Sequence, residues 1–520
     1  MTAELDALGR NAQQRPHKIA AHTIGGTVLD YATLDRRAAS FAAYLQSLGL
    51  QVGDRIATLL GNRGETLAAW WGARRAGLYF IPLSPRMRGA ELTHILHDSG
   101  ACAVIADDGA LPAAIEVRAA LGRDGPAHWL TQDQSLDGWQ DLASEGGAAS
   151  PSMWRTPSHV GRELIYSSGT SGRPKGIRRA LVRWEDGDQL PALERQMRMA
   201  YELDAETIYL SASPVYHATG RFLTRVIEGG GTTVILPQFD PGSALRALRE
   251  HGITHSQWVP TMFSRLLALP EEDRAGHAAP AHRIALHAAA PCPLPIKRAM
   301  IDWWGHILIE YYGGSENAGI TLIRSEEWLL RPGSVGRSIG GAIHVLDPEA
   351  PSVELTTGEV GLITFEGGVP FTYLDGSSGS SSLTPQGFAT YGDLGHVDQD
   401  GYLFLSGRRS DLIIRGGVNV YPAEVEAVIE AHPAVREAAV VGRQDGEYGE
   451  AVVAILCTDL GGLARDRLAE ELDAQCRAAL SSIKCPSEFR FVAALPRNEN
   501  GKILKRVIRD AIESGEEIGA

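Results

Sequence analysis

Hydrophobic and polar positions alternate along the first part of the chain with two different periods. Residues 31–48 and 64–76 carry apolar side chains at helical spacing, whereas 55–60, 79–83 and 104–106 are short apolar runs between turn residues. Short strands separated by amphipathic helices predict βαβ units and a mostly parallel sheet. The same alternation returns further along the chain, so we expect an α/β fold.

The pattern changes near residue 410. Beyond that point it predicts a helix after Pro422, then two strands and a second helix, at 437–442, 451–457 and 463–481. This is a compact α+β unit of about 110 residues, large enough for a core of its own. We therefore expect a large domain, residues 1–409, and a small one, residues 410–520.

Composition narrows the class of protein. The net charge of −14 argues against the broad basic face of a nucleic-acid-binding protein but leaves nucleotide binding open. The five cysteines form no C-x-x-C pair, which argues against a zinc site or a disulfide framework and favours a reduced, cytoplasmic protein. The first residues lack the pattern of a signal peptide, and no run of about 18 apolar residues predicts a membrane span.

The run from Tyr166 to Gly176 concentrates hydroxyls, glycines and one lysine, Lys175. Glycines allow backbone N–H groups to turn toward an anion, Ser and Thr add donors, and the lysine adds a positive charge. A Walker loop has Ser or Thr after its lysine, so Gly176 indicates a different kind of phosphate loop. Runs of this composition also form plain surface loops, and the residue types alone leave both interpretations open.

The order Ser-Ser-Gly-Thr-Ser-Gly-Arg-Pro-Lys-Gly, residues 167–176, resembles the phosphate loop of the adenylate-forming superfamily. That superfamily includes acyl- and aryl-CoA synthetases, peptide adenylation domains and beetle luciferases. The resemblance spans nearly the whole chain, with the motifs in the family's order. It implies mostly parallel sheets plus a distorted β-barrel in the large domain, a mobile small domain, and a homodimer as a possible assembly. It also implies ATP, Mg²⁺, CoA and a small carboxylic acid as ligands.

The resemblance assigns specific residues to nucleotide and CoA binding. These are Ser167, Ser168, Gly169, Thr170, Ser171, Gly172, Lys175, Ala289, Ala290, Pro291, Tyr312, Gly313, Ser315, Asp393, Arg408 and Gly417. Tyr312 is expected to stack on adenine, Asp393 to accept hydrogen bonds from both ribose hydroxyls, and Arg408 to add a cationic fork. Ala288 and Ala289 replace two glycines of the family's Gly-Gly-Ala-Pro segment, and Tyr391 is inserted in its Thr-Gly-Asp-x-Gly signature.

Three residues are assigned to catalysis by the same resemblance. Glu316 is the expected Mg²⁺ ligand, because Mg²⁺ takes few protein carboxylates and keeps several waters. Lys502 is expected to bridge the carboxylate and the α-phosphate, and His217 to border the acyl site. Ser410 is the predicted interdomain hinge, about which Gly417 would replace Lys502 for thioester formation.

The acyl pocket is expected to be open. Its predicted residues are His217, Ala218, Thr219, Trp258, Gly313 and Gly314. Acetate-activating relatives carry Trp where this chain has Gly313, so we expect a medium-chain, aromatic or polycyclic acid. For Trp258 and the residues after it, a plain core helix is the alternative. The acceptor is expected to be CoA, with an amine or a carrier-protein thiol as the alternative, and a non-catalytic nucleotide-binding homologue as a third reading.

Overall fold

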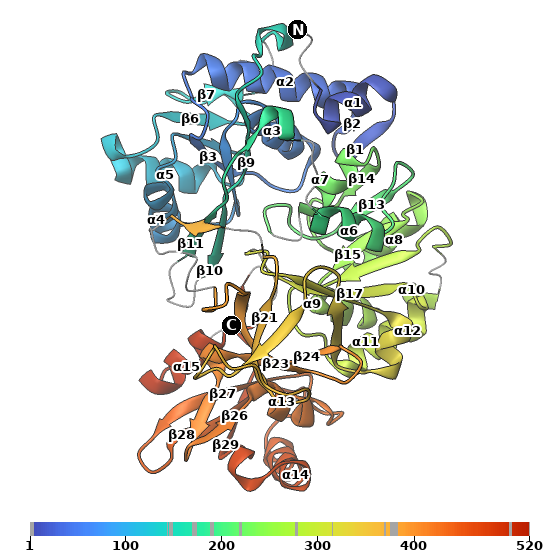
Figure 1. Cartoon of the computed structure of the whole chain (residues 1–520), viewed down its shortest axis with the longest axis vertical. Helices are drawn as coiled ribbons and strands as arrows, with labels where there is room; N and C mark the ends of the chain where they lie inside the picture. The colour runs from blue at the N-terminus through green and yellow to red at the C-terminus, as the bar shows by residue number, and fades with distance from the viewer. Residues whose placement is uncertain are drawn as a thin grey trace.

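The computed structural model describes residues 5–142, 144, 149–168, 174–187, 192–217, 221–275, 279–314, 316–368, 371–374, 383–498 and 502–518. In Figure 1 the blue and cyan elements of the N-terminal part lie at the top and the orange and red C-terminal elements at the bottom. Strand β17 (Leu308–Gly313), which ends in the predicted nucleotide-binding residues Tyr312 and Gly313, lies between them.

A six-stranded parallel sheet forms the N-terminal part, in the order β7-β6-β5-β3-β4-β9. Its strands are β3 (Arg55–Leu59), β4 (Tyr79–Leu83), β5 (Ala103–Ala106), β6 (His128–Thr131), β7 (Gln140–Asp141) and β9 (Arg162–Glu163). Its helices are α2 (Tyr31–Ser47), α3 (Gly64–Arg75), α4 (Gly89–Ser99) and α5 (Leu111–Leu121). The predicted helices and strands of this region are confirmed.

A thirteen-stranded sheet follows, parallel over one part and antiparallel over the other. The parallel part contains β1 (Ile19–Thr23), β14 (Thr232–Ile235), β13 (Ile208–Ser211), β15 (His255–Trp258), β16 (Ile284–His287) and β17 (Leu308–Gly313), with β2 (Val28–Asp30) antiparallel at its edge. Its helices are α1 (Ala7–Gln14), α6 (Ala192–Ala200), α7 (Arg221–Glu228), α8 (Pro241–Glu250), α9 (Pro260–Leu267), α10 (Glu271–Ala275), α11 (Leu294–Trp304) and α12 (Ser325–Leu330).

The antiparallel part continues from β17 and takes the place of the expected barrel. It contains β18 (Ile320–Arg324), β19 (Ser334–Ser338), β24 (Leu403–Arg408), β23 (Ala389–Val397), β21 (Gly361–Phe365) and β20 (Ile343–Leu346). β20 ends the sheet, so the ladder of described strands does not close on itself. Short strands complete the large domain: β8 (His159–Val160), β10 (Ile165–Ser168), β11 (Pro174–Arg178), β12 (Val182–Arg183) and β22 (Thr372–Tyr373).

The C-terminal part has its own sheet and its own core. Its elements are β25 (Ile413–Arg415), β26 (Val418–Val420), α13 (Pro422–Glu430), β27 (Glu437–Asp445), β28 (Gly449–Cys457), α14 (Leu463–Ala479), β29 (Glu488–Val492) and α15 (Lys505–Ser514). Two hydrophobic clusters, one on each side of β27 and β28, draw only on residues beyond 412. The predicted α+β unit is therefore confirmed as a separate domain, and the boundary at 409/410 stays a prediction.

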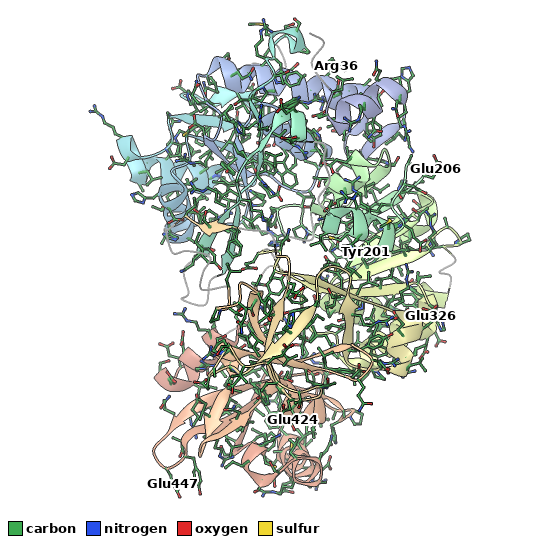
Figure 2. The ribbon with its side chains drawn as sticks, in the orientation of Figure 1. Arg36, Tyr201, Glu206, Glu326, Glu424 and Glu447 are labelled. Atoms are coloured by element: carbon green, nitrogen blue, oxygen red, sulfur yellow. The ribbon has the colours of Figure 1, made fainter. Side chains whose placement is uncertain are left out.

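Large apolar and aromatic side chains fill the core of the protein. Tyr201 is fully buried against Phe222 and Tyr311, with ring centroids 5.5 and 6.0 Å away, whereas Arg36 and Glu206 lie at the periphery (Figure 2). Among the described helices, none is both long and apolar enough to cross a membrane.

Candidate active site

The predicted phosphate loop joins two antiparallel strands. β10 pairs with β11 so that Ser167 lies opposite Lys175 and Ser168 opposite Pro174. The loop residues Gly169, Thr170, Ser171 and Gly172 lie outside the described residues. Lys175 stands at the base of the loop, with its ammonium group 5.3 Å from the centre of the Tyr373 ring. The hairpin thus presents the loop on a fixed stem, as an anion-binding loop requires.

Tyr312, Asp393 and Arg408 meet where β17 lies near the β23–β24 pair. The Tyr312 hydroxyl donates a hydrogen bond of 2.6 Å to Asp393 Oδ2. Arg408 lies opposite Asp393 in the ladder, and its Nε is 3.4 Å from Asp393 Oδ1. Burial raises the pKa of Asp393, and Arg408, Tyr312 and Lys502 act against that rise. The predicted ribose acceptor is therefore held between an aromatic donor and a cation.

Lys502 reaches the same site from the C-terminal domain. Its pKa is lowered to about 8, by burial and then by repulsion from Arg408, while the carboxylates of Asp393, Asp411 and Glu316 favour the charged form. Its backbone N–H donates to Asn498 Oδ1 at 2.9 Å, which fixes the chain at this point. The structure thus brings Lys502 within electrostatic range of Asp393, Arg408 and Glu316.

The adenine segment leaves the end of β16 with a strained backbone. Ala289 has φ +80°, a conformation that residues with a Cβ rarely adopt. In the family's motif a glycine stands here, which has no such cost. The alanine therefore keeps the glycine's backbone path at the expense of local strain.

The acyl side differs from prediction at two residues. Trp258 has no exposed surface and packs against Phe263 and Trp304, while its Nε1 donates to Ser256 Oγ at 2.6 Å. It is a core residue, so its assignment to the acyl pocket is wrong. A Cβ on Gly314 would lie 2.5 Å from the Tyr391 ring, so Gly314 does not open the pocket either.

Gly313 and His217 fit an open acyl site better. A Cβ on Gly313 would make only ordinary contacts, 3.5 Å from the Gly319 carbonyl oxygen and 3.6 Å from Ile320. Burial lowers the pKa of His217 to about 4, so its imidazole is neutral at physiological pH. Its ring packs edge-on against Tyr216 at 4.6 Å. Ala218 and Thr219 lie outside the described residues.

Comparison with known proteins decides the family. A family model described as AMP-binding enzyme matches residues 8–371, and one described as AMP-binding enzyme C-terminal domain matches residues 424–502. The chain is an AMP-binding enzyme. It belongs to the adenylate-forming superfamily of acyl- and aryl-CoA synthetases, as its motifs predicted.

This AMP-binding enzyme is similar to its relatives over nearly its whole length. Feruloyl-CoA synthase of an Amycolatopsis species is 31% identical over 511 residues, which cover 96% of this chain and 97% of the relative. A long-chain-fatty-acid–CoA ligase of Mycobacterium tuberculosis is 29% identical, with 93% of each chain covered. The crystal structure of ATP-bound MatB from Rhodopseudomonas palustris superimposes with a TM-score of 0.82 at 29% identity, covering 98% of this chain and 99% of MatB. The predicted α/β fold class with a separate C-terminal domain is thereby confirmed.

In this AMP-binding enzyme, the two small-domain residues predicted to serve the two half-reactions lie in different surroundings. Lys502 lies in the site, whereas Gly417 lies in an exposed two-residue turn between β25 and β26. Gly416 and Gly417 have φ +57° and +77°, which suits the tight hairpin turns that favour glycine. The predicted hinge, Ser410, lies between the domains in a 3₁₀ turn, Arg409–Asp411, and its carbonyl accepts from Arg509 at 3.5 Å.

Glu316 is the one predicted metal ligand, and its surroundings fit Mg²⁺ in part. Among the described residues, no group of three His, Cys, Asp or Glu side chains could enclose a metal ion. Mg²⁺ is seldom held by a full protein cage; one or two carboxylates, phosphate oxygens and waters suffice. Glu316 supplies such a carboxylate within electrostatic range of Lys502. Ser315 lies outside the described residues.

A buried ion pair beneath the adenine segment was missed by sequence reasoning. Lys297 on α11 bonds to Glu310 Oε2 on β17, and both side chains are almost fully buried. His287, at the end of β16, lies 3.9 Å from the same oxygen, and burial and Lys297 hold its pKa well below the usual value. The pair ties α11, which follows the adenine segment, to β17, which carries Tyr312. No local pattern in the sequence marks it.

Proposed function

We propose that this enzyme is an AMP-forming carboxylic acid–CoA ligase. The observation that carries the proposal is the convergence of Tyr312, Asp393, Arg408 and Lys502 from distant parts of the chain. An adenine stack, a ribose acceptor, a phosphate cation and a mobile lysine are the parts that an acyl-adenylation site needs. The CoA-ligase names of the relatives support the same activity.

The first half-reaction is the attack of a carboxylate oxygen on the α-phosphorus of ATP. It forms the acyl-adenylate and expels pyrophosphate. Lys502 would align the two anions that must meet, and Lys175 would neutralise charge on the phosphates. Glu316 would hold Mg²⁺, which supplies further neutralisation of the pyrophosphate when bound.

The second half-reaction transfers the acyl group to CoA. The thiolate attacks the acyl carbon, the acyl–phosphate bond breaks, and AMP leaves. For this step we propose a rotation of the small domain about Ser410 that withdraws Lys502 and brings the exposed Gly417 turn to the site. The exposure of that turn and the independent core of its domain support such a movement.

For the acid we propose a medium-chain, aromatic or polycyclic carboxylate. The absence of a side chain at Gly313, where a Cβ would make only ordinary contacts, supports this class. Two relatives support the aromatic part of this range. One is named feruloyl-CoA synthase and the other 2-succinylbenzoate–CoA ligase, at 31% and 30% identity, and the feruloyl and 2-succinylbenzoyl groups are both aromatic.

A panel of acids tests the proposal. Purified protein is incubated with ATP, Mg²⁺ and each acid, and AMP release is measured with and without CoA. We expect CoA to increase AMP release with at least one acid of the proposed class and an acyl-CoA thioester to appear by mass spectrometry. Pyrophosphate exchange without any thioester would favour transfer to an amine or a carrier-protein thiol. No exchange with any acid would overturn the proposal.

A further inference from the structure

The loop that joins β17 to β18 carries Glu316 and is closed by a residue from another strand. Gly313 pairs with Ile320 at its base, and residues 314–319 form the loop. Asn317 has φ +52°, and its N–H donates to the Gly314 carbonyl at 3.1 Å. The residues of this loop that the structure describes, Gly314 and 316–319, also pack against another strand.

Tyr391 of β23 holds the far end of this loop through its hydroxyl. The phenol donates to the Gly319 carbonyl oxygen at 2.7 Å and accepts from the Gly319 N–H at 3.2 Å. Gly319 has no room for a side chain, because a Cβ would lie 2.2 Å from the Phe365 ring. Both polar groups of one loop residue are therefore satisfied by a single side chain.

The ring of Tyr391 holds the near end of the loop. It lies where the Cβ of any other residue at Gly314 would be, with Cε1 2.5 Å from that position. The same ring packs edge-on against Tyr312 at 5.6 Å, with planes 85° apart. The Tyr312 ring is thus supported by Tyr391 on one side and approached by Phe365 at 6.3 Å.

Glu316 lies between the two ends that Tyr391 holds. Its Oε2 lies 3.0 Å from the position of a Cβ on Gly314, so its carboxylate is next to the ring. Burial raises the pKa of Tyr391 to about 12, so the phenol stays protonated and can keep donating to Gly319. The inserted residue of the Thr-Gly-Asp-x-Gly signature therefore has a defined place, beside both the carboxylate and the predicted adenine stack.

We propose that Tyr391 is a positioning residue for adenylation, which fixes the Gly314–Gly319 loop and thereby aims the Glu316 carboxylate at the metal–pyrophosphate group of ATP. This inference rests on the proposed function of the site. It concerns Tyr391 acting through Glu316, not contact of Tyr391 with the substrate.

The test compares Tyr391→Phe with Tyr402→Phe. The first removes the two bonds to Gly319 and keeps the ring. The second removes another buried phenol's hydrogen bond, of 2.7 Å to Glu327, in the same antiparallel region. ATP binding is measured by calorimetry with and without Mg²⁺, and ATP–pyrophosphate exchange is measured with an acid that the wild type accepts. Thermal unfolding checks that each variant is folded.

We expect Tyr391→Phe to weaken Mg²⁺-dependent ATP binding by about tenfold, the effect of one or two lost buried hydrogen bonds. Binding of ATP without Mg²⁺ should stay within about twofold of the wild type. Exchange should fall in parallel, and Tyr402→Phe should change neither quantity.

A second comparison separates positioning from general loosening of the fold. On a Glu316→Gln background, Tyr391→Phe should cause no further loss of Mg²⁺-dependent binding, because the two residues act through one contact. Equal losses on both backgrounds, equal losses with and without Mg²⁺, or an unchanged Tyr391→Phe enzyme would each overturn the inference. Absence of exchange in the wild type would instead refute the proposed function.

Discussion

The hydroxyl of Tyr312 donates a 2.6 Å hydrogen bond to Asp393. The two residues come from β17 and β23, which do not pair with each other in the sheet. The bond therefore links the predicted adenine stack directly to the predicted ribose acceptor. A substitution at either residue should therefore alter the position of the other.

Tyr312→Phe should weaken ATP binding while leaving the acid's KM unchanged. The ring that stacks is kept, but Asp393 loses a donor that orients it, a loss of about 1 kcal/mol, or roughly fivefold in the KM for ATP. Initial rates of pyrophosphate exchange at varied ATP and varied acid measure both constants. An equal rise in both would show that the bond supports the fold rather than the nucleotide site.

The adenylation rate should fall as the pH rises through about 8. The pKa of Lys502 is lowered to about 8, so its ammonium group is charged below that pH and increasingly neutral above it. Because the proposed role needs the charge, kcat/KM for exchange, which reports the free enzyme, should decline above pH 8. Lys502→Arg stays charged and should lose this decline. If kcat/KM of Lys502→Arg declined at the same pH as that of the wild type, the decline would have to come from the titration of another group.

Ala289→Gly should stabilise the protein. Ala289 has φ +80°, and glycine adopts that conformation without the clash of a Cβ, so we expect a gain of about 1 kcal/mol in the free energy of unfolding. Ala290, whose φ is not positive, is the matched control, and Ala290→Gly should be neutral or destabilising by up to about 1 kcal/mol. Urea unfolding measures the free energy of unfolding of both variants. Equal changes in the two variants would show that the backbone at Ala289 is not strained.

Lys297→Met should destabilise the fold strongly. It leaves the Glu310 carboxylate buried without its counter-charge, at a cost of about 3–5 kcal/mol. Replacing both partners, as Lys297→Met with Glu310→Leu, should recover most of that loss because no charge is left buried. Urea unfolding of the wild type, the single and the double variant distinguishes these cases. A double variant as unstable as the single would show that the ion pair is not the cause.

Local patterns and motifs predicted much of this molecule, and tertiary packing decided the rest. The strands β3 and β4 are identifiable because a strand buried on both faces is a short continuous apolar run between turn residues. Asp393, Arg408 and Lys502 stand in motifs specific enough to assign them. The burial of Trp258, by contrast, depends on Phe263 and Trp304, and the space at Gly314 is filled by a ring from β23. No pattern near either residue could have indicated these contacts.

The proposed rotation about Ser410 predicts that Lys502 serves only the first half-reaction. Lys502→Ala and a control, Lys484→Ala, separate the two steps. Lys484 lies in the same domain and pairs with Glu424 at 2.7 Å, and Figure 2 places Glu424 within the C-terminal domain.

The decisive measurement follows each half-reaction of Lys502→Ala separately: pyrophosphate exchange with ATP and an accepted acid, and thioester formation from the preformed acyl-adenylate and CoA. Exchange should fall by about 100-fold or more, as for loss of a group that stabilises transition-state charge, while thioester formation stays within about threefold of the Lys484→Ala control. Exchange at the control's rate, or equal losses in both half-reactions, would contradict the account.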